Sequence, residues 1–115
     1  MGTNAYGDHH LGVRPEDNPD EWRRRIASAV RIEGVAEVEA AQLTERFATI
    51  YVEKGGRRCL DDSTPVIELI VSGEELDFTF ENETWTVVEC PGPEARAEAI
   101  ESLAADSARE SRLWW

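Results

Sequence analysis

The sequence of 115 residues contains few of the side chains that enzyme and metal sites most often use. Its two histidines are adjacent, at His9 and His10, and its two cysteines, Cys59 and Cys90, form no Cys-x-x-Cys pair. It has no Gly-rich phosphate loop, no serine nucleophile elbow and no set of metal ligands at a typical spacing. Acid–base catalysis usually needs a histidine or a desolvated carboxylate in a cleft. We therefore expect no enzymatic activity, no cofactor and no metal site.

Long apolar runs are absent as well. No stretch of about eighteen apolar residues occurs, so we expect no membrane span. Residues 1–11 lack the basic and apolar regions of a signal peptide, which favours a cytoplasmic location. Nothing else indicates a disulfide scaffold, so Cys59 and Cys90 either pair with each other or, as we favour, remain free buried thiols.

Positive charge is scarce. The chain has 12 Lys and Arg residues against 24 Asp and Glu residues, a net charge of −12, and Lys54 is its single lysine. Residues 1–31 contain equal numbers of acids and bases, so the whole excess of negative charge falls on residues 32–115. Direct binding to nucleic acid is disfavoured, because a phosphate backbone needs basic side chains against it. This composition, with many acidic residues and a single lysine, also resembles that of proteins from halophilic archaea.

What the sequence does contain is a central β-rich stretch, residues 64–90. Three runs alternate between apolar and polar residues, at 65–71, 76–81 and 84–89, and turn residues separate them. We expect an antiparallel meander whose turns are at 72–75 and 82–83, because this register places the aromatic side chains on one face. The expected pairs are Val71–Leu76, Leu69–Phe78 and Ile67–Phe80 in the first hairpin, and Phe80–Trp85 and Phe78–Val87 in the second.

The flanking segments predict two helices. Asn18-Pro19-Asp20-Glu21 is a typical helix start, and the helix should run to about Arg31, with Gly34 ending it. Residues 94–112 are rich in Ala, Glu and Arg and predict a second helix. Residues 46–53 predict a strand, after a turn at 43–45. Residues 35–41 allow a helix or a strand, and Val38 favours the strand.

The order of helix, Gly34-Val35-x-x-Val38 strand, turn and second strand resembles part of the ferredoxin-like heavy-metal-associated domains. The metal-binding cysteine pair of that family is missing, so the resemblance implies a fold and no activity. We predict a flexible arm over residues 1–17 and one α+β domain over residues 18–115. The domain should have two layers: a largely antiparallel sheet of about five strands, with the N-terminal and C-terminal helices packed on one of its faces.

The sheet face away from the helices should then be acidic, which suggests two functions. The first is a non-enzymatic protein-interaction module that presents this face to a basic protein, as inhibitors of the immunity or anti-defence type do. The second is a salt-adapted cytosolic protein whose acidity is a response to solvent, and whose C-terminal tryptophans mediate homo-oligomer or complex formation. The candidate partner-binding residues are Glu68, Glu74, Glu75, Asp77, Glu81, Glu83, Trp114 and Trp115.

Overall fold

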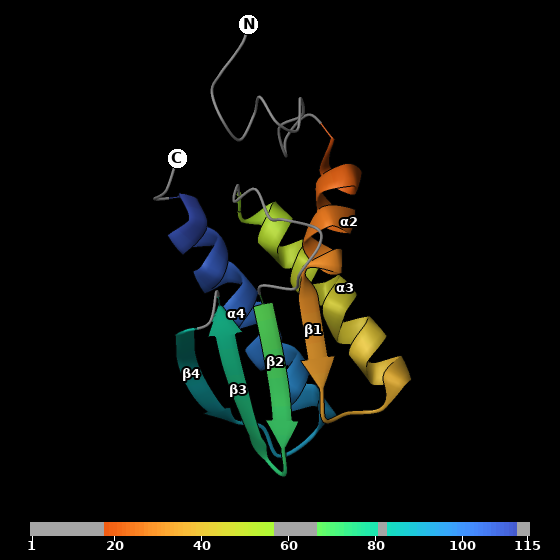
Figure 1. Cartoon of the computed structure of the whole chain (residues 1–115), viewed down its shortest axis with the longest axis vertical. Helices are drawn as coiled ribbons and strands as arrows, with labels where there is room; N and C mark the ends of the chain where they lie inside the picture. Colours follow the sequence, from red (N-terminus) through yellow and green to blue (C-terminus); the bar gives the residue numbers. More distant parts are fainter. Residues whose placement is uncertain (1–17, 57–66, 81–82, 113–115) are drawn as a thin grey trace, which may run out of the picture.

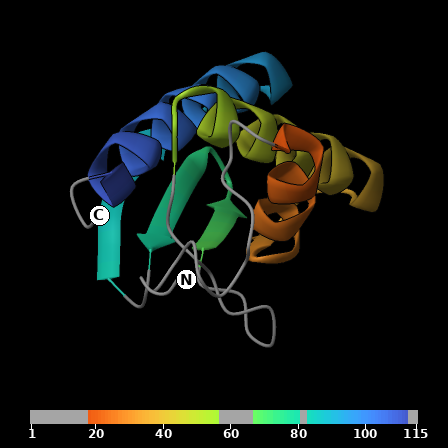
Figure 2. The ribbon, with the colours of Figure 1, turned by 90° about the horizontal axis from the view of Figure 1, so that it is seen from above.

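A computed structural model of the protein describes residues 18–56, 67–80 and 83–112 (Figure 1). The elements are α2 (Pro19–Ser28), β1 (Val30–Glu33), α3 (Glu37–Glu53), β2 (Ile67–Ser72), β3 (Glu75–Phe80), β4 (Glu83–Glu89) and α4 (Pro93–Arg112). The strands form one sheet in the order β1-β2-β3-β4. Helices α3 and α4 lie over one face of this sheet, α4 on the side of β4 and α3 toward β1 (Figure 2). The predicted two-layer α+β fold, with an N-terminal and a C-terminal helix, is confirmed.

Helix α2 begins as the sequence predicts. The Asn18 side chain accepts a hydrogen bond of 3.2 Å from the Glu21 backbone N–H, which caps the first turn. The helix ends at Ser28, however, and not near Arg31. Residues 30–33 instead form β1, which pairs in parallel with residues 67–70 of β2, and Val30 is buried as a strand residue. The paired strand ends the helix three residues earlier than its apolar pattern suggests.

The predictions of a turn at residues 43–45 and a strand at residues 46–53 were wrong, because both ranges belong to one helix of 17 residues, α3. Residues 37–41 are part of the same helix, so the helix, and not the strand that we favoured, is the correct alternative there. Leu43, Phe47 and Tyr51 are spaced four residues apart and are buried on one stripe of the helix. The Phe47 ring lies 6.0 Å from the Tyr51 ring and 6.2 Å from the Phe78 ring of β3, measured between centroids. The resemblance to heavy-metal-associated domains fails with these strands, and the sheet has four described strands.

Parallel pairing of β1 with β2 explains why a helix is needed at this place. Parallel neighbours cannot be joined by a tight hairpin, and they require a crossover that is usually helical. Helix α3 provides it, packing against α2, α4 and β1. Gly34 begins the connection with φ at +94°, a conformation that other residues rarely adopt, and a Cβ atom there would meet the backbone carbonyl of Val71.

The first hairpin has the predicted register, with the pairs Ile67–Phe80, Leu69–Phe78 and Val71–Leu76. The second hairpin does not. Phe80 pairs with Glu83 and Phe78 with Thr86, so the strands are shifted relative to the prediction and Trp85 is an extra residue between Thr84 and Thr86. An extra residue is typical of a β-bulge, which changes the side of the sheet on which the following residues lie. Val87 therefore pairs with Asp77 and is 58% exposed.

Helix α4 occupies nearly the predicted range, and its Ile100 and Leu103 are buried in the core, as are Trp22 and Ile26 of α2. The core lies between these helices and the apolar face of the sheet. Cys90, directly after β4, is a free, buried thiol. None of the helices in the described ranges is long and apolar enough to cross a membrane.

Candidate functional site

The candidate site is the face of the sheet that points away from α3 and α4, which we call the open sheet face. Residues directly opposite each other on paired strands share a face, so the register identifies its members. No described helix covers it (Figures 1 and 2). Its residues are Arg31, Glu33, Glu68, Ile70, Ser72, Glu75, Asp77, Thr79, Thr84, Val87 and Glu89.

Negative charge dominates this surface. The face has a single basic residue, Arg31, and its acidic residues are Glu33, Glu68, Glu75, Asp77 and Glu89. The pairing arranges its residues in rows across the strands. Arg31, Glu68, Thr79 and Thr84 form the first row; Glu33, Ile70, Asp77 and Val87 form the second; Ser72, Glu75 and Glu89 form the third.

Only Glu68 of the first row and Glu33 of the second row have a basic partner among the described residues of this face. The Arg31 guanidinium forms ion pairs with Glu68 and, at 3.1 Å, with Glu33. Among the ion pairs of the described residues, none involves Glu75, Asp77 or Glu89. The end of the face formed by the second and third rows therefore carries carboxylates that no described basic side chain neutralises.

Apolar side chains lie among these carboxylates. In the second row Ile70 is half-buried and Val87 is 58% exposed, one on each side of Asp77. Val87 and Val38 are the large hydrophobic residues that are exposed in the described part of the chain. Carboxylates beside an exposed aliphatic side chain can contact a partner both through charge and through apolar surface.

The predicted site residues do not all lie on this face. Glu68, Glu75 and Asp77 are members, and Glu74 lies in the turn between β2 and β3. Glu83 pairs with Phe80, which places it on the helix side of the sheet. The predictions for Glu81, Trp114 and Trp115 fall outside the described residues, as do those for Cys59 and for the arm of residues 1–17.

Sequence reasoning missed Glu33 and Val87. Glu33 was assigned to the end of the first helix, and only the parallel pairing of β1 places it beside Ile70. Val87 was assigned to the core because the alternation was continued through β4 without the extra residue at Trp85. The alternating pattern Val30-Arg31-Ile32-Glu33 was the available signal for β1.

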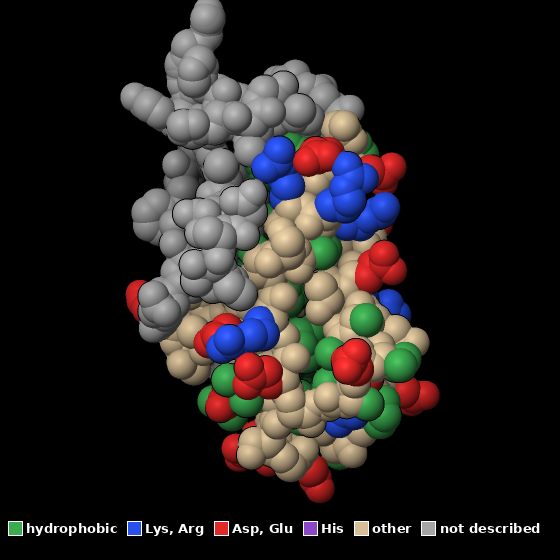
Figure 3. Space-filling view, turned by 45° about the vertical axis from the view of Figure 1, so that its right-hand side comes forward, with side chains coloured by type: hydrophobic (Ala, Val, Ile, Leu, Met, Phe, Trp, Pro, Cys, Tyr) green, Lys and Arg blue, Asp and Glu red, His purple; other side chains and the backbone are tan. Residues whose placement is uncertain are grey.

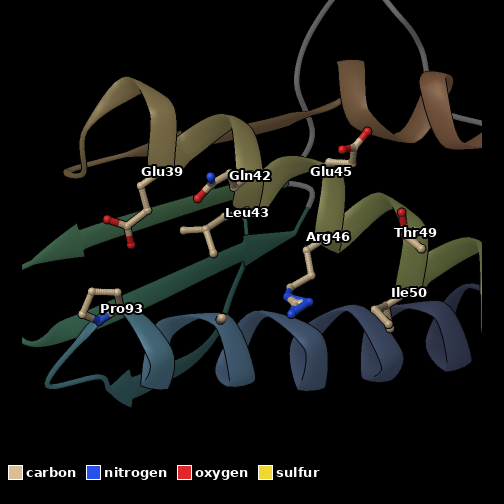
Figure 4. A pocket seen from close by; sticks show the side chains of 9 residues that line it. Glu39, Gln42, Leu43, Glu45, Arg46, Thr49, Ile50 and Pro93 are labelled. Atoms are coloured by element: carbon tan, nitrogen blue, oxygen red, sulfur yellow. The ribbon is translucent and has the colours of Figure 1, made fainter.

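A second candidate is the groove between α3 and α4, which has a volume of about 490 Å³ (Figure 4). Figure 4 shows Glu39 and Arg46 projecting from α3 toward α4. Both are ion-paired there: Arg46 with Glu101 at 2.9 Å, and Glu39 with Arg96, whose Nε and Nη2 donate hydrogen bonds of 2.7 and 3.0 Å to the two carboxylate oxygens. These pairs join the two helices, so we assign the charged groups of this groove to stability.

The Glu39–Arg96 pair shifts the ionisation of its own members and of a neighbour. Its hydrogen bonds lower the pKa of Glu39 and raise the pKa of Arg96. Burial raises the pKa of the Cys90 thiol, and the nearby Arg96 charge opposes this rise only in part. A thiol with a raised pKa is a poor nucleophile. No cluster of His, Cys, Asp and Glu suited to a metal ion occurs among the described residues.

The arginines of α2 form no isolated basic patch. Figure 3 shows basic side chains gathered on this side of the molecule with acidic side chains between them. Arg23 pairs with Asp20 at 2.9 Å, while Arg24 and Arg25 both pair with Glu21. Their partners are thus acids of the same helix. All three arginines are therefore ion-paired within α2.

Comparison with known proteins gives no assignment: no family model, no curated protein and no solved structure matches this chain.

Proposed function

We propose that this protein is a small acidic protein-interaction module that binds a basic protein through the open sheet face. The observation that carries the proposal is the set of unneutralised carboxylates, Glu75, Asp77 and Glu89, around the exposed Val87. A uniform negative field accelerates association with a positive partner, and the apolar contact adds affinity at short range. Inhibitors that mimic nucleic acid act in this way, and an inhibitory role of that type is the specific form we propose.

A second function has its own support. Acidic residues also lie on the exposed surface of the helices, including Glu94, Glu98 and Glu110 of α4. A spread of this kind favours a salt-adapted protein, whose acidity would follow from the solvent and not from a partner. The two functions make different predictions for a cationic ligand. A binding module should attract it more strongly to the open sheet face than to the helices, whereas a salt-adapted protein should attract it equally to both.

The test compares two variants that change the net charge equally. Glu75→Lys/Asp77→Lys reverses two charges on the open sheet face, and Glu94→Lys/Glu110→Lys reverses two exposed charges on α4. All four positions are partly or fully solvent-exposed, so both variants should remain folded, which circular dichroism checks. The probe is an octa-arginine peptide, titrated by NMR and by fluorescence anisotropy at low and at molar KCl.

If the open sheet face is the binding surface, amide shifts should concentrate on β2, β3 and β4, and the face variant should lose at least about tenfold in affinity, roughly 1.4 kcal/mol. The α4 variant should lose much less, and molar salt should abolish binding. Equal losses in the two variants, with shifts spread over α3 and α4, would favour salt adaptation instead.

A further inference from the structure

The free edge of β4 is a second candidate binding surface, and it adjoins the open sheet face at Val87 and Glu89. Strand β4 lies at the end of the sheet and pairs, within the described residues, with β3 alone. A strand in this position presents unpaired N–H and C=O groups along its outer side. Its sequence, Glu83 to Glu89, is rich in β-branched residues and contains no proline that would block an incoming strand.

The hydrogen bonds identify which groups point outward. The Cys90 N–H donates to the Glu74 carbonyl oxygen of the β2–β3 turn, at 2.6 Å. Because the direction of backbone groups alternates along an antiparallel strand, Val88 also directs its N–H toward β3. The N–H groups of Val87 and Glu89 must then point away from the sheet, toward the free edge.

A hollow lies next to this edge. It has a volume of about 450 Å³ and lies between the end of β4 and one face of α4. Its apolar lining includes Val88 and Leu103, and small residues of α4 leave room for side chains. Its acidic members are Glu89, Glu98 and Asp106, with no basic residue among the lining positions. Asp106 pairs with Arg109 at 2.8 Å, which leaves Glu89 and Glu98 without an ion pair among the described residues.

We infer that this edge binds an extended segment of a partner protein, which adds as a strand to β4 and has alternating basic and apolar residues. Successive side chains of an added strand point to opposite sides. One set would enter the hollow between β4 and α4, where Val88 and Leu103 favour apolar groups. The other set would lie beside the open sheet face, where Glu89 favours basic groups. Backbone hydrogen bonds to Val87 and Glu89 would hold the segment, as in other cases of strand addition.

A second copy of the chain is a poorer occupant. Antiparallel pairing of β4 with β4 around Thr86 would place Glu83 of each copy opposite Glu89 of the other. Like charges directly opposite each other destabilise a strand pair, and each chain has a net charge of −12. Charge complementarity therefore selects a basic segment of another protein.

The test uses a synthetic octapeptide of alternating arginine and valine, a control octapeptide with glutamate in place of arginine, and amide hydrogen exchange of the full chain. Strand addition should slow exchange at the Val87 and Glu89 amides, and only the arginine peptide should do so. The variant Val87→Pro removes an outward N–H and leaves the β3 pairing intact. Its matched control, Val87→Thr, keeps the N–H and the β-branched shape.

We expect Val87→Pro to bind the arginine peptide about five- to tenfold more weakly than Val87→Thr does. This ratio of dissociation constants corresponds to the loss of one backbone hydrogen bond. Ala99→Leu, which fills the hollow from an α4 position suited to leucine, should weaken binding as well. Binding of the peptide without slowed exchange at these two amides would overturn strand addition while leaving the proposed role of the open sheet face standing. No binding, equal affinity of the two Val87 variants, or a dimer with the same amides protected would also overturn it.

Discussion

Two proline substitutions distinguish the observed helix α3 from two strands joined by a turn, the alternative that we favoured from the sequence. Glu37 is the first residue of α3, and it follows Ala36, whose extended backbone (φ −62°, ψ 152°) suits the residue before a proline. The Glu37 N–H also precedes the first intrahelical bond, which the Ala40 N–H donates to the Ala36 carbonyl. Glu37→Pro should therefore change the free energy of unfolding by less than about 1 kcal/mol.

Glu45 is the matched position, because it is also an exposed glutamate but lies in the middle of α3. Glu45→Pro would remove a hydrogen bond to the residue four positions earlier, and its ring would clash with that carbonyl. The expected loss is about 3 kcal/mol or more. The neighbouring Phe47 is fully buried against Phe78, so the helix cannot bend there without disturbing the core.

For a domain of this size, a loss of that magnitude lowers the melting temperature by roughly 10–20 °C. The assay is urea unfolding followed by tryptophan fluorescence, since Trp22 is buried, together with a thermal melt by circular dichroism. Two strands joined by a turn at residues 43–45 would give the opposite order, with proline tolerated in the turn and damaging at residue 37. That reversed order would refute the helical assignment and, with it, the parallel pairing that places β1 on the open sheet face.

Two further predictions concern stability. Because the pKa of Glu39 is lowered in the folded state by its hydrogen bonds with Arg96, its contribution to stability is present above the ordinary glutamate pKa and is lost as the pH falls through the lowered value. In urea unfolding from about pH 7 to about pH 3, Glu39→Gln should be less stable than the unaltered protein at neutral pH, by about 1–2 kcal/mol, and the difference should shrink at the acid end; a constant difference would contradict this role. Gly34→Ala should destabilise more than Gly73→Ala, because both glycines have positive φ but only at Gly34 would the added Cβ meet backbone, that of Val71. Equal melting temperatures of these two variants would contradict the close contact between the Gly34 and Val71 backbones.

Local signals in the sequence were sufficient for several elements. The hydrogen bond from the Glu21 N–H to Asn18 marks the start of α2 as predicted, and strict alternation fixed the register of the first hairpin. In both cases neighbouring residues carry all the necessary information. A cap requires residues three positions apart, and a slip of the hairpin would expose its aromatic side chains.

The failures arose where distant parts of the chain decide the structure. The run 46–53 is rich in β-branched and aromatic residues, and its strand propensity concealed the four-residue spacing of Leu43, Phe47 and Tyr51. Tertiary packing against Phe78 favours the helix over local propensity. The bulge at Trp85 has no comparable local pattern, so the exposure of Val87 could not be read from alternation.

These differences changed the candidate site. The acidity of residues 68–77 was evident from the sequence, but the contribution of β1 to the same face depends on its parallel pairing with β2. The removal of Glu83 from the face depends on its pairing with Phe80. Composition therefore identified the kind of surface, while the topology identified which carboxylates share it.

The measurement that tests the central claim most directly is urea unfolding of the unaltered protein across KCl concentrations from near zero to molar, followed by tryptophan fluorescence. If the acidity of the open sheet face serves binding, the protein should be well folded at the lowest salt concentration, with a midpoint that changes little as KCl is added. A protein that is unfolded near zero salt and regains its structure only at molar KCl would contradict the claim, because its carboxylates would then be an adaptation to solvent.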